Sequence, residues 1–395
     1  MLSTVYKSIL LSSIVALSLD AADTSILSKT QQNSLNLSEE KIIKDAKTLK
    51  NDWINPITYT YSYSDSQKNG HSKTSTIAIN QPLFKSGGIY YAIKYADNLK
   101  NSSILAIDLQ KQALIKQALN LAYTIKKTNL QIEQQKLAIK NAKIDLRIKK
   151  ESVLNGLLDT SFLNNAIITL NNQKSALLEL EHAKLSLLNN FSNLSDKSVE
   201  EIKLPILAQI DQESFSQNNI EISKNKADVK VQKNLSQMSK SRFLPTINLN
   251  YSKTMYHNDT TSFEDGDTND ILGFNIVMPF DIKAFDTIDS SKLEYQKTKN
   301  NLEILKQESI NFFKSQNLKV AMLDAKIDLT KENISSYEEL LNQMEELYNV
   351  GLKTSDDVAL LKNSKKSETI KIQILEYEKQ IELLEIYGKI TSDKI

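Results

Sequence analysis

The residue types that most often carry chemistry are few in this chain, and none has the spacing of a catalytic or metal site. There is no cysteine, and the three histidines are scattered: His71 and His257 fall in expected loops between strands, and His182 falls on an expected helix. None has a metal-ligating partner three or four positions later, the spacing that places two ligands on one helix face. We expect all three imidazoles to be solvated.

Two further patterns are similar to ligand sites but do not complete them. Gly87 and Gly88 are the only glycines near one another, so neither a phosphate-binding loop nor a dinucleotide fingerprint can form. The acidic stretch 265–270 is similar to a calcium loop, but it lacks the glycine at the sixth position and has Ile276 where the bidentate glutamate belongs. We expect a solvated loop there, with no catalytic residue, cofactor, metal site or enzymatic activity.

Composition and the first residues limit the partners and the compartment. The 49 basic and 48 acidic residues give a net charge of +1, so we expect no nucleic-acid partner.

Residues 1–22 have the features of a signal peptide, with Lys7, an apolar run at 9–19, and then Ala21 and Ala22. The apolar run is shorter than the roughly 20 residues that span a bilayer, so it is not a transmembrane helix. The alternative to a signal peptide is a buried N-terminal helix. We expect an exported chain, either soluble or embedded in a membrane as a β-barrel.

Two very long helices dominate the expected structure. The stretches 89–155 and 281–350 contain no glycine or proline, and each is closed by one glycine, Gly156 and Gly351. The second stretch has an apolar residue every seven positions, the pattern of a coiled-coil seam: Val320, Ile327, Ile334, Leu341 and Tyr348. Polar residues after each glycine can cap a returning helix. The predicted helical hairpins are therefore 89–155 with 160–190, and 281–350 with 355–387.

The first long helix carries two apolar stripes about 200° apart. One stripe consists of Ile125, Ile132, Ile139, Leu146 and Val153, and the other of Leu130, Leu137 and Ile144. An ordinary surface helix has a single apolar stripe. Two opposed stripes indicate neighbours on both sides, as in a closed ring of helices or in the middle of a helical bundle.

A strand hairpin is predicted before each long helix. In 57–81, tyrosines alternate with threonine and serine, which is the period of a strand with two different faces, and 246–278 alternates in a similar way. We expect Pro82 to separate the first hairpin from the helix that follows. Two shorter helices are also predicted, one at 38–49 capped by Ser38 and one at 219–242.

These elements form two tandem repeats, 23–205 and 206–395. Pro279 follows Pro82 by 197 positions, and Gly351 follows Gly156 by 195. Four strands cannot close a barrel, and open sheet edges pair readily with other chains, so we expect identical subunits to share their strands. Aromatic side chains of the strands would then face lipid. A soluble sandwich with a tyrosine-rich face is the alternative.

Short motifs mark the element boundaries, and Met278-Pro279-Phe280 echoes Gln81-Pro82-Leu83-Phe84 of the first repeat. The other motifs are Leu37-Ser38-Glu39 with Ala46 and Asn55-Pro56; Phe243-Leu244-Pro245; and Tyr348-Asn349-Val350-Gly351 with Asp357-Val358. In order and spacing the chain resembles the TolC-type outer-membrane efflux proteins over essentially its whole mature length. The resemblance implies an α+β membrane protein that forms a homotrimer. Each subunit would give four strands to a shared twelve-stranded outer-membrane β-barrel and its long coiled-coil-like hairpins to a periplasmic α-barrel. A periplasmic adaptor and an inner-membrane transporter would dock at its tip.

The same resemblance implies a channel gate at the glycine turns, with Tyr348, Lys353 and Asp357 as its residues. Lys353 replaces the arginine usual in the family and loses its planar fork. Leu360 and Phe162 stand where the family has further acids. From the residues alone, three Asp357 side chains near an axis would favour cations, but acids in a first helical turn also complement the helix dipole. For Asp356 we favour the dipole role, and for Tyr348 we favour packing.

The first hypothesis for function is a trimeric outer-membrane exit duct of a tripartite efflux or type I secretion system. It would transport passively, in contact with outer-membrane lipid and with a large periplasmic part. The second hypothesis is a periplasmic coiled-coil adaptor or scaffold without a pore. The duplicated strand hairpins favour the channel, because a scaffold needs neither them nor their tyrosines.

Overall fold

The computed structural model describes residues 26–66, 70–258 and 263–390, so the predicted signal peptide lies outside the described residues. The chain divides into two compact units. The strand unit contains Ser34–Leu109 and Ile220–Ser309. The hairpin unit contains Gln110–Asn219, the residues from Ile310 onwards and those before Ser34.

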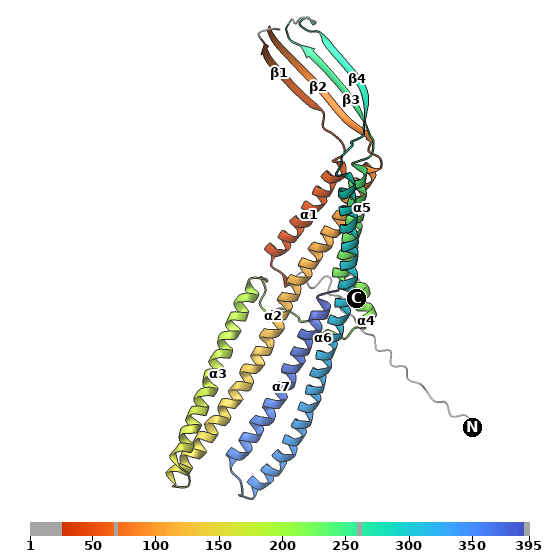
Figure 1. Ribbon diagram of the computed structural model, residues 1–395. Coiled ribbons are helices and arrows are strands. Elements are labelled where there is room, and N and C mark those ends of the chain that lie inside the picture. Colours follow the sequence, from red (N-terminus) through yellow and green to blue (C-terminus); the bar gives the residue numbers. More distant parts are fainter. Residues whose placement is uncertain (1–25, 67–69, 259–262, 391–395) are drawn as a thin grey trace, which may run out of the picture. The chain divides into compact units, whose positions relative to one another are not determined.

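Helices make up most of the described chain (Figure 1): α1 (Lys29–Asn51), α2 (Gly88–Leu154), α3 (Thr160–Ser192), α4 (Gln212–Asn218), α5 (Ile220–Ser241), α6 (Ala284–Asn349) and α7 (Ser355–Tyr387). The bounds of α2, α3, α5, α6 and α7 lie within three residues of those expected from the sequence, whereas α4 had no counterpart among the expected elements. Within the described residues, none of the helices combines the length and the apolar character needed to cross a membrane.

The prediction of a short helix capped by Ser38 is wrong. Helix α1 begins at Lys29, and Ser38 lies inside it, where its hydroxyl donates to the Ser34 carbonyl at 2.8 Å. The start of the helix is held by Ser28, whose Oγ accepts from the Gln31 N–H at 3.3 Å. A polar residue can cap a helix only where no helical turn precedes it, and here the turn before Ser38 is already formed.

One antiparallel sheet unites the two strand hairpins in the order β1-β2-β3-β4. Its strands are β1 (Thr58–Ser66), β2 (Gly70–Phe84), β3 (Thr246–Tyr256) and β4 (Thr268–Val277). The central pairing of β2 with β3 joins the two repeats, with Asn80 opposite Asn250. Strands β1 and β4 each have one neighbour, so the sheet of a single chain has two open edges.

Two expectations about β2 are wrong. Pro82 does not end the hairpin but lies within β2, opposite Asn248, and the register shifts between Pro82 and Phe84. Such an irregularity accommodates a residue that has no N–H to donate to the ladder. His71 was expected in a loop, yet it lies in β2, where its Nδ1 is 3.1 Å from the Tyr63 hydroxyl.

In the hairpin unit, the side-chain contacts order the helices as α3, α2, α7 and α6 (Figure 1). The Gln135 amide of α2 donates to Gln173 Oε1 of α3 at 2.6 Å. Lys127 of α2 pairs with Glu378 of α7, and Lys379 of α7 pairs with Asp324 of α6 at 2.6 Å. Helices α2 and α7 therefore have neighbours on both sides, while α3 and α6 are the edges of this helical layer.

The two predicted stripes of α2 are buried along the middle of the helix. Ile125, Ile132 and Ile139 of the first stripe are less than a tenth exposed. Leu137 of the second stripe forms a core cluster with Ile370 and Ile374 of α7, against which Leu130 packs. Two opposed apolar stripes thus correspond to a helix enclosed between two neighbours.

Candidate gate at the helical turns

Both long helices end on the same backbone motif. Gly156 has φ +74° and Gly351 has φ +77°, in the left-handed region that glycine adopts without steric cost. The Gly156 N–H donates to the Val153 carbonyl and the Leu157 N–H to the Ser152 carbonyl. The equivalent pair of bonds at the second turn runs from Gly351 to Tyr348 and from Leu352 to Leu347. Each turn therefore satisfies the last carbonyls of its helix in the same way.

Each turn also presents large apolar side chains to solvent. Leu154 and Leu157 at the first turn are 75% exposed, and Val350 and Leu352 at the second are 70% and 71% exposed. Apolar side chains this exposed in matching places indicate a surface that is covered in an assembly.

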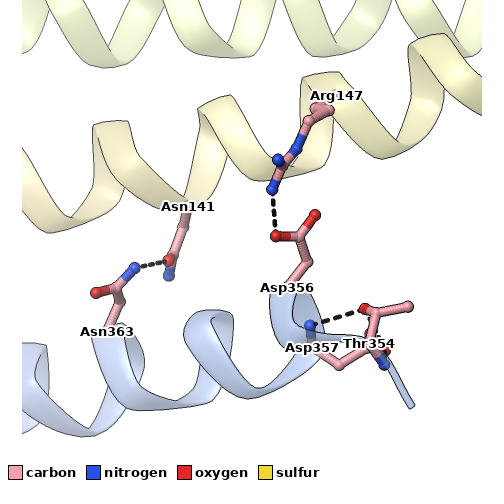
Figure 2. Close-up of polar contacts among 6 residues, drawn as sticks. All are labelled: Asn141, Arg147, Thr354, Asp356, Asp357 and Asn363. Atoms are coloured by element: carbon pink, nitrogen blue, oxygen red, sulfur yellow. Dashed lines mark hydrogen bonds and ion pairs between the residues drawn. The ribbon is translucent and has the colours of Figure 1, made fainter. Parts of the chain in front are cut away.

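The returning helices begin with different caps. In the first repeat, the Asp159 carboxylate accepts from the Ser161 N–H at 2.8 Å. In the second, Thr354 and Asp357 form a capping box, in which Asp357 Oδ2 accepts from the Thr354 N–H at 3.0 Å and the Asp357 N–H donates to Thr354 Oγ1 (Figure 2). Thr354 Oγ1 also donates to Asp357 Oδ2 at 2.9 Å.

These bonds stabilise the charged form of both carboxylates. The backbone N–H of Ser161 holds the pKa of Asp159 below its usual value. The backbone N–H and hydroxyl of Thr354 do the same to the pKa of Asp357, with a smaller contribution from Lys353. Both acids are therefore anionic over the whole neutral range, and the local cap is one role that Asp357 does fill.

An ion pair near the turns joins the two repeats. Arg147 of α2 contacts the Asp356 carboxylate at the start of α7 (Figure 2). We expected Asp356 only to complement the helix dipole, so its partner was missed. One signal was available, because Arg147 is one of only two arginines in a chain with 49 basic residues. Arginine is the residue best suited to a directed pair with a carboxylate.

Further polar contacts continue from this pair along α2 and α7. The Asn363 amide donates to Asn141 Oδ1 at 2.8 Å (Figure 2). The Gln134 amide donates to the Ser367 carbonyl at 3.3 Å. A groove of about 350 Å³ follows these residues. Along the interface of α2 with α7, apolar contacts such as those of Leu137 thus alternate with polar ones.

Of the other expected gate residues, Lys353 lies close enough to Asp357 to contribute to the lowered pKa of its carboxyl. Tyr348 is 46% exposed and Phe162 is 47% exposed, Lys353 is exposed, and Leu360 is half-buried. Tyr348 is therefore only about half covered by its own chain, whereas Val320 and Ile327 of the same seam are buried. In the described part of the chain, no group of three histidine, cysteine or acidic side chains could hold a metal ion.

The comparisons with known proteins point to one family. Residues 213–387 match the model of the family described as "Outer membrane efflux protein". No curated protein gives a significant match. This match confirms the predicted resemblance, and the family is one of outer-membrane efflux channels rather than enzymes.

Solved structures with the same fold span the whole chain. The outer membrane protein VceC from Vibrio cholerae is 14% identical with a TM-score of 0.73, covering 92% of this chain and 93% of its own. The CmeC outer membrane channel of Campylobacter jejuni is 12% identical with a TM-score of 0.74, covering 95% of this chain and 86% of its own. The MtrE outer membrane channel of Neisseria gonorrhoeae is 15% identical with a TM-score of 0.68, covering 91% and 86%. The largely helical chain with one four-stranded sheet is thus the fold of these channels.

Proposed function

Because residues 213–387 match the outer membrane efflux protein family and the whole chain has the fold of its channels, we propose that three copies of this chain form an outer-membrane exit duct. Transport through the duct is passive. The energy comes from an inner-membrane transporter, reached through a periplasmic adaptor at the exposed leucines of the helical turns. The duct serves a tripartite efflux or type I secretion system.

The observation that carries this proposal is a sheet with two chemically different faces. The apolar face carries large and aromatic side chains at paired positions: Tyr59, Tyr61, Ile77, Ile79, Ile247, Leu249, Tyr251, Leu272, Phe274 and Ile276. Phe274 and Leu272 are 74% and 72% exposed. The opposite, polar face carries mainly threonine, serine and asparagine. Strands with an apolar outer face and a polar inner face are typical of outer-membrane barrels.

The open edges of this sheet indicate how many strands the closed barrel contains. A four-stranded sheet is too narrow to close on itself, and the smallest single-chain membrane barrels have about 8 strands. Three copies that pair β1 of one with β4 of the next give a closed twelve-stranded barrel without edges. Closure also satisfies every backbone donor and acceptor within the lipid.

The helical layer has open edges as well. Seven exposed apolar side chains of α6 fall within about 40° on a helical wheel: Leu293, Ile304, Leu318, Met322, Leu329, Leu340 and Leu347. Phe285 and Tyr348 lie outside this stripe. At the other edge, three exposed apolar residues of α3, Ile167, Leu178 and Leu185, fall within about 20°, while Phe162 and Ile168 lie outside this stripe. Each stripe lies away from the neighbour that the helix has in its own chain. Packing α6 of one copy on α3 of the next closes the layer into a ring.

We place the gate of this duct at the second glycine turn, with Asp357, Lys353 and Tyr348 near the threefold axis. Replacing Asp357 with Asn should weaken the block of the open channel by multivalent cations, since a ring of three carboxylates attracts them. The matched control is Asp159→Asn, which changes the capping acid of the first repeat. If Asp357→Asn leaves the block unchanged, the capping box is the whole role of Asp357.

A direct test of the duct is conductance of the purified protein in a planar lipid bilayer. We expect discrete channels, a trimer in detergent, and release from outer membranes only by detergent. Absence of channel activity together with extraction in buffer alone would contradict the proposal and favour a periplasmic scaffold without a pore.

A further inference from the structure

The charged side chains of the sheet are unevenly distributed between its faces. The four strands contain four acidic or basic residues, Asp65, Lys73, Lys253 and Asp270. In the antiparallel register Asp65 lies opposite His71, Tyr63 opposite Lys73, and Lys253 opposite Asp270 and Ile77. Since residues directly opposite one another share a face, all four charges lie on the apolar face. Lys253 and Asp270 form an ion pair there at 3.7 Å.

The polar face consequently carries no aspartate, glutamate, lysine, arginine or histidine among the described strand residues. Most of its members are hydroxyl and amide residues: Thr58, Thr60, Ser62, Ser64, Ser72, Thr74, Thr76, Asn80, Thr246, Asn248, Asn250, Ser252, Thr254, Asn269 and Asn275. Their side chains also bond to one another across the strands. Thr76 Oγ1 lies 3.1 Å from Thr254 Oγ1, and the Asn250 amide donates to Asn275 Oδ1 at 2.8 Å.

The polar face is also the hollowed one. A groove of about 390 Å³ is lined in the main by residues of this face, among them Asn80, Asn250, Ser252 and Ile271. A face that is both concave and polar is the one that surrounds water when a sheet closes. Ile271, which pairs with Ser252, is the one large aliphatic side chain on the polar face between the ends of the described strands.

From this distribution we propose that the strand-lined exit is neutral and passes solutes of either charge sign equally well. This inference rests on the proposed duct and specifies which solutes its outer part accepts. Hydroxyl and amide groups each offer a donor and an acceptor, so they solvate cations and anions alike. A wall without fixed charge adds no barrier that depends on the sign of the solute. Any discrimination by charge therefore falls to the helical part of the duct.

The test uses the natural absence of cysteine, which makes every introduced thiol unique. Ser252→Cys places a thiol of similar size on the polar face, and Tyr251→Cys places one on the apolar face. Membrane-embedded trimers are treated with two methanethiosulfonates of similar size, one bearing a sulfonate and one a trimethylammonium group. We expect both reagents to modify Ser252→Cys, with a rate ratio within about threefold of the ratio for a small free thiol. Tyr251→Cys should react with neither, because lipid covers it.

A second variant shows that the assay senses charge. Asn250→Asp in the Ser252→Cys background adds one carboxylate per subunit on the same face, two positions away. We expect it to shift the rate ratio at least tenfold toward the cationic reagent. A preference of more than tenfold in Ser252→Cys alone would overturn the neutral exit. Reaction at Tyr251→Cys with protection of Ser252→Cys would instead overturn the proposed duct, because the polar face would then not line water.

Discussion

The two helical hairpins share their backbone design but differ in what holds them together. Helices α3 and α7 both have 33 residues, yet α3 contains four acidic or basic residues and α7 contains twelve. Four ion pairs join α6 to α7: Lys319 with Glu382, Asp324 with Lys379, Glu338 with Lys365, and Glu345 with Lys362. Among the described residues no ion pair joins α2 to α3, which instead contact through amides such as Gln135 and Gln173.

The long helices α2 and α6 also differ in their net charge near the turns. The last twenty positions before Gly156 contain six basic and two acidic residues, a net charge of +4. The last twenty before Gly351 contain one basic and five acidic residues, a net charge of −4. The pair of Arg147 with Asp356 joins the basic end of α2 to the acidic start of α7. The hairpin of α6 and α7 is thus held together by ion pairs within its chain, and that of α2 and α3 by amide contacts, while both hairpins present an apolar edge.

The largest expected effect comes from the apolar edge of α3. Leu178→Lys, like Leu329→Lys on α6, should abolish the trimer, because a lysine would be buried against an apolar neighbour without a partner. Light scattering of the detergent-solubilised protein measures the loss. Asn172→Lys, exposed on another face of α3, is the matched control and should remain trimeric. A normal trimer of Leu178→Lys would show that α3 is not an edge between copies.

The next effect tests whether the two turns are equivalent. Gly156→Ala and Gly351→Ala should each lower stability by about 1–2 kcal/mol, the cost of a left-handed conformation for an L-residue. A methyl group at either glycine would have no neighbouring atom within 4 Å, so the cost is that of the backbone alone. Thermal unfolding measures it, and Gly273→Ala in β4, which has no positive φ and open space around it, should show no such loss. Clearly unequal losses at the two turns would contradict their equivalence.

A smaller effect tests whether ion pairs stabilise the second hairpin and not the first. Raising the NaCl concentration from about 50 mM to about 1 M should speed amide hydrogen exchange in α7 relative to α3, because salt screens exposed ion pairs. Lys379→Met should cost about 0.5 kcal/mol, as expected for a partly exposed pair. Gln173→Met in the first hairpin is its control and should leave the salt response of exchange unchanged. Equal salt responses in α3 and α7 would show that the ion pairs do not contribute.

The smallest effect concerns the caps and pH. The pKa values of Asp159 and Asp357 are lowered in the folded chain, so their contribution to stability is complete above the usual value of 3.8. It is lost as the pH falls through the lowered folded-state pKa. Exchange at the starts of α3 and α7 should therefore rise together in acid. In Asp159→Asn, the start of α3 should lose its acid response, because asparagine caps a helix without titrating, while α7 should keep it.

Whether a feature could be predicted from the sequence depends on how far apart in the chain the interacting residues lie. The glycine turns, the strands and the long helices follow from local patterns, so residues such as Gly351 and the alternating tyrosines were sufficient to locate them. The capping box of Thr354 with Asp357 was also local and visible, and the sequence left both the pore role and the first-turn role of Asp357 open. The start of α1 at Lys29 was missed because Ser38 has the right type for a cap but lies inside a formed helix.

Contacts between distant segments could not be predicted in the same way. Arg147 and Asp356 are 209 positions apart, and each has several alternative charged partners in the sequence. The neutral character of the polar face depends on the register between strands, which decides the face of Lys253 and Asp270. The family resemblance, rather than a local pattern, supplied Tyr348 and Lys353 as gate residues, and that role stays a prediction.

The pairing of β2 with β3 has a consequence for how the chain is made. Asn80 pairs with Asn250, which comes 170 positions later, so the first hairpin has no inner partner until most of the chain has been synthesised. Contacts between such distant residues form slowly, because a long loop must close first. During that time β2 exposes an unpaired edge that is prone to aggregation. We therefore expect biogenesis of this protein to depend on a holding chaperone that shields the first hairpin until the second arrives.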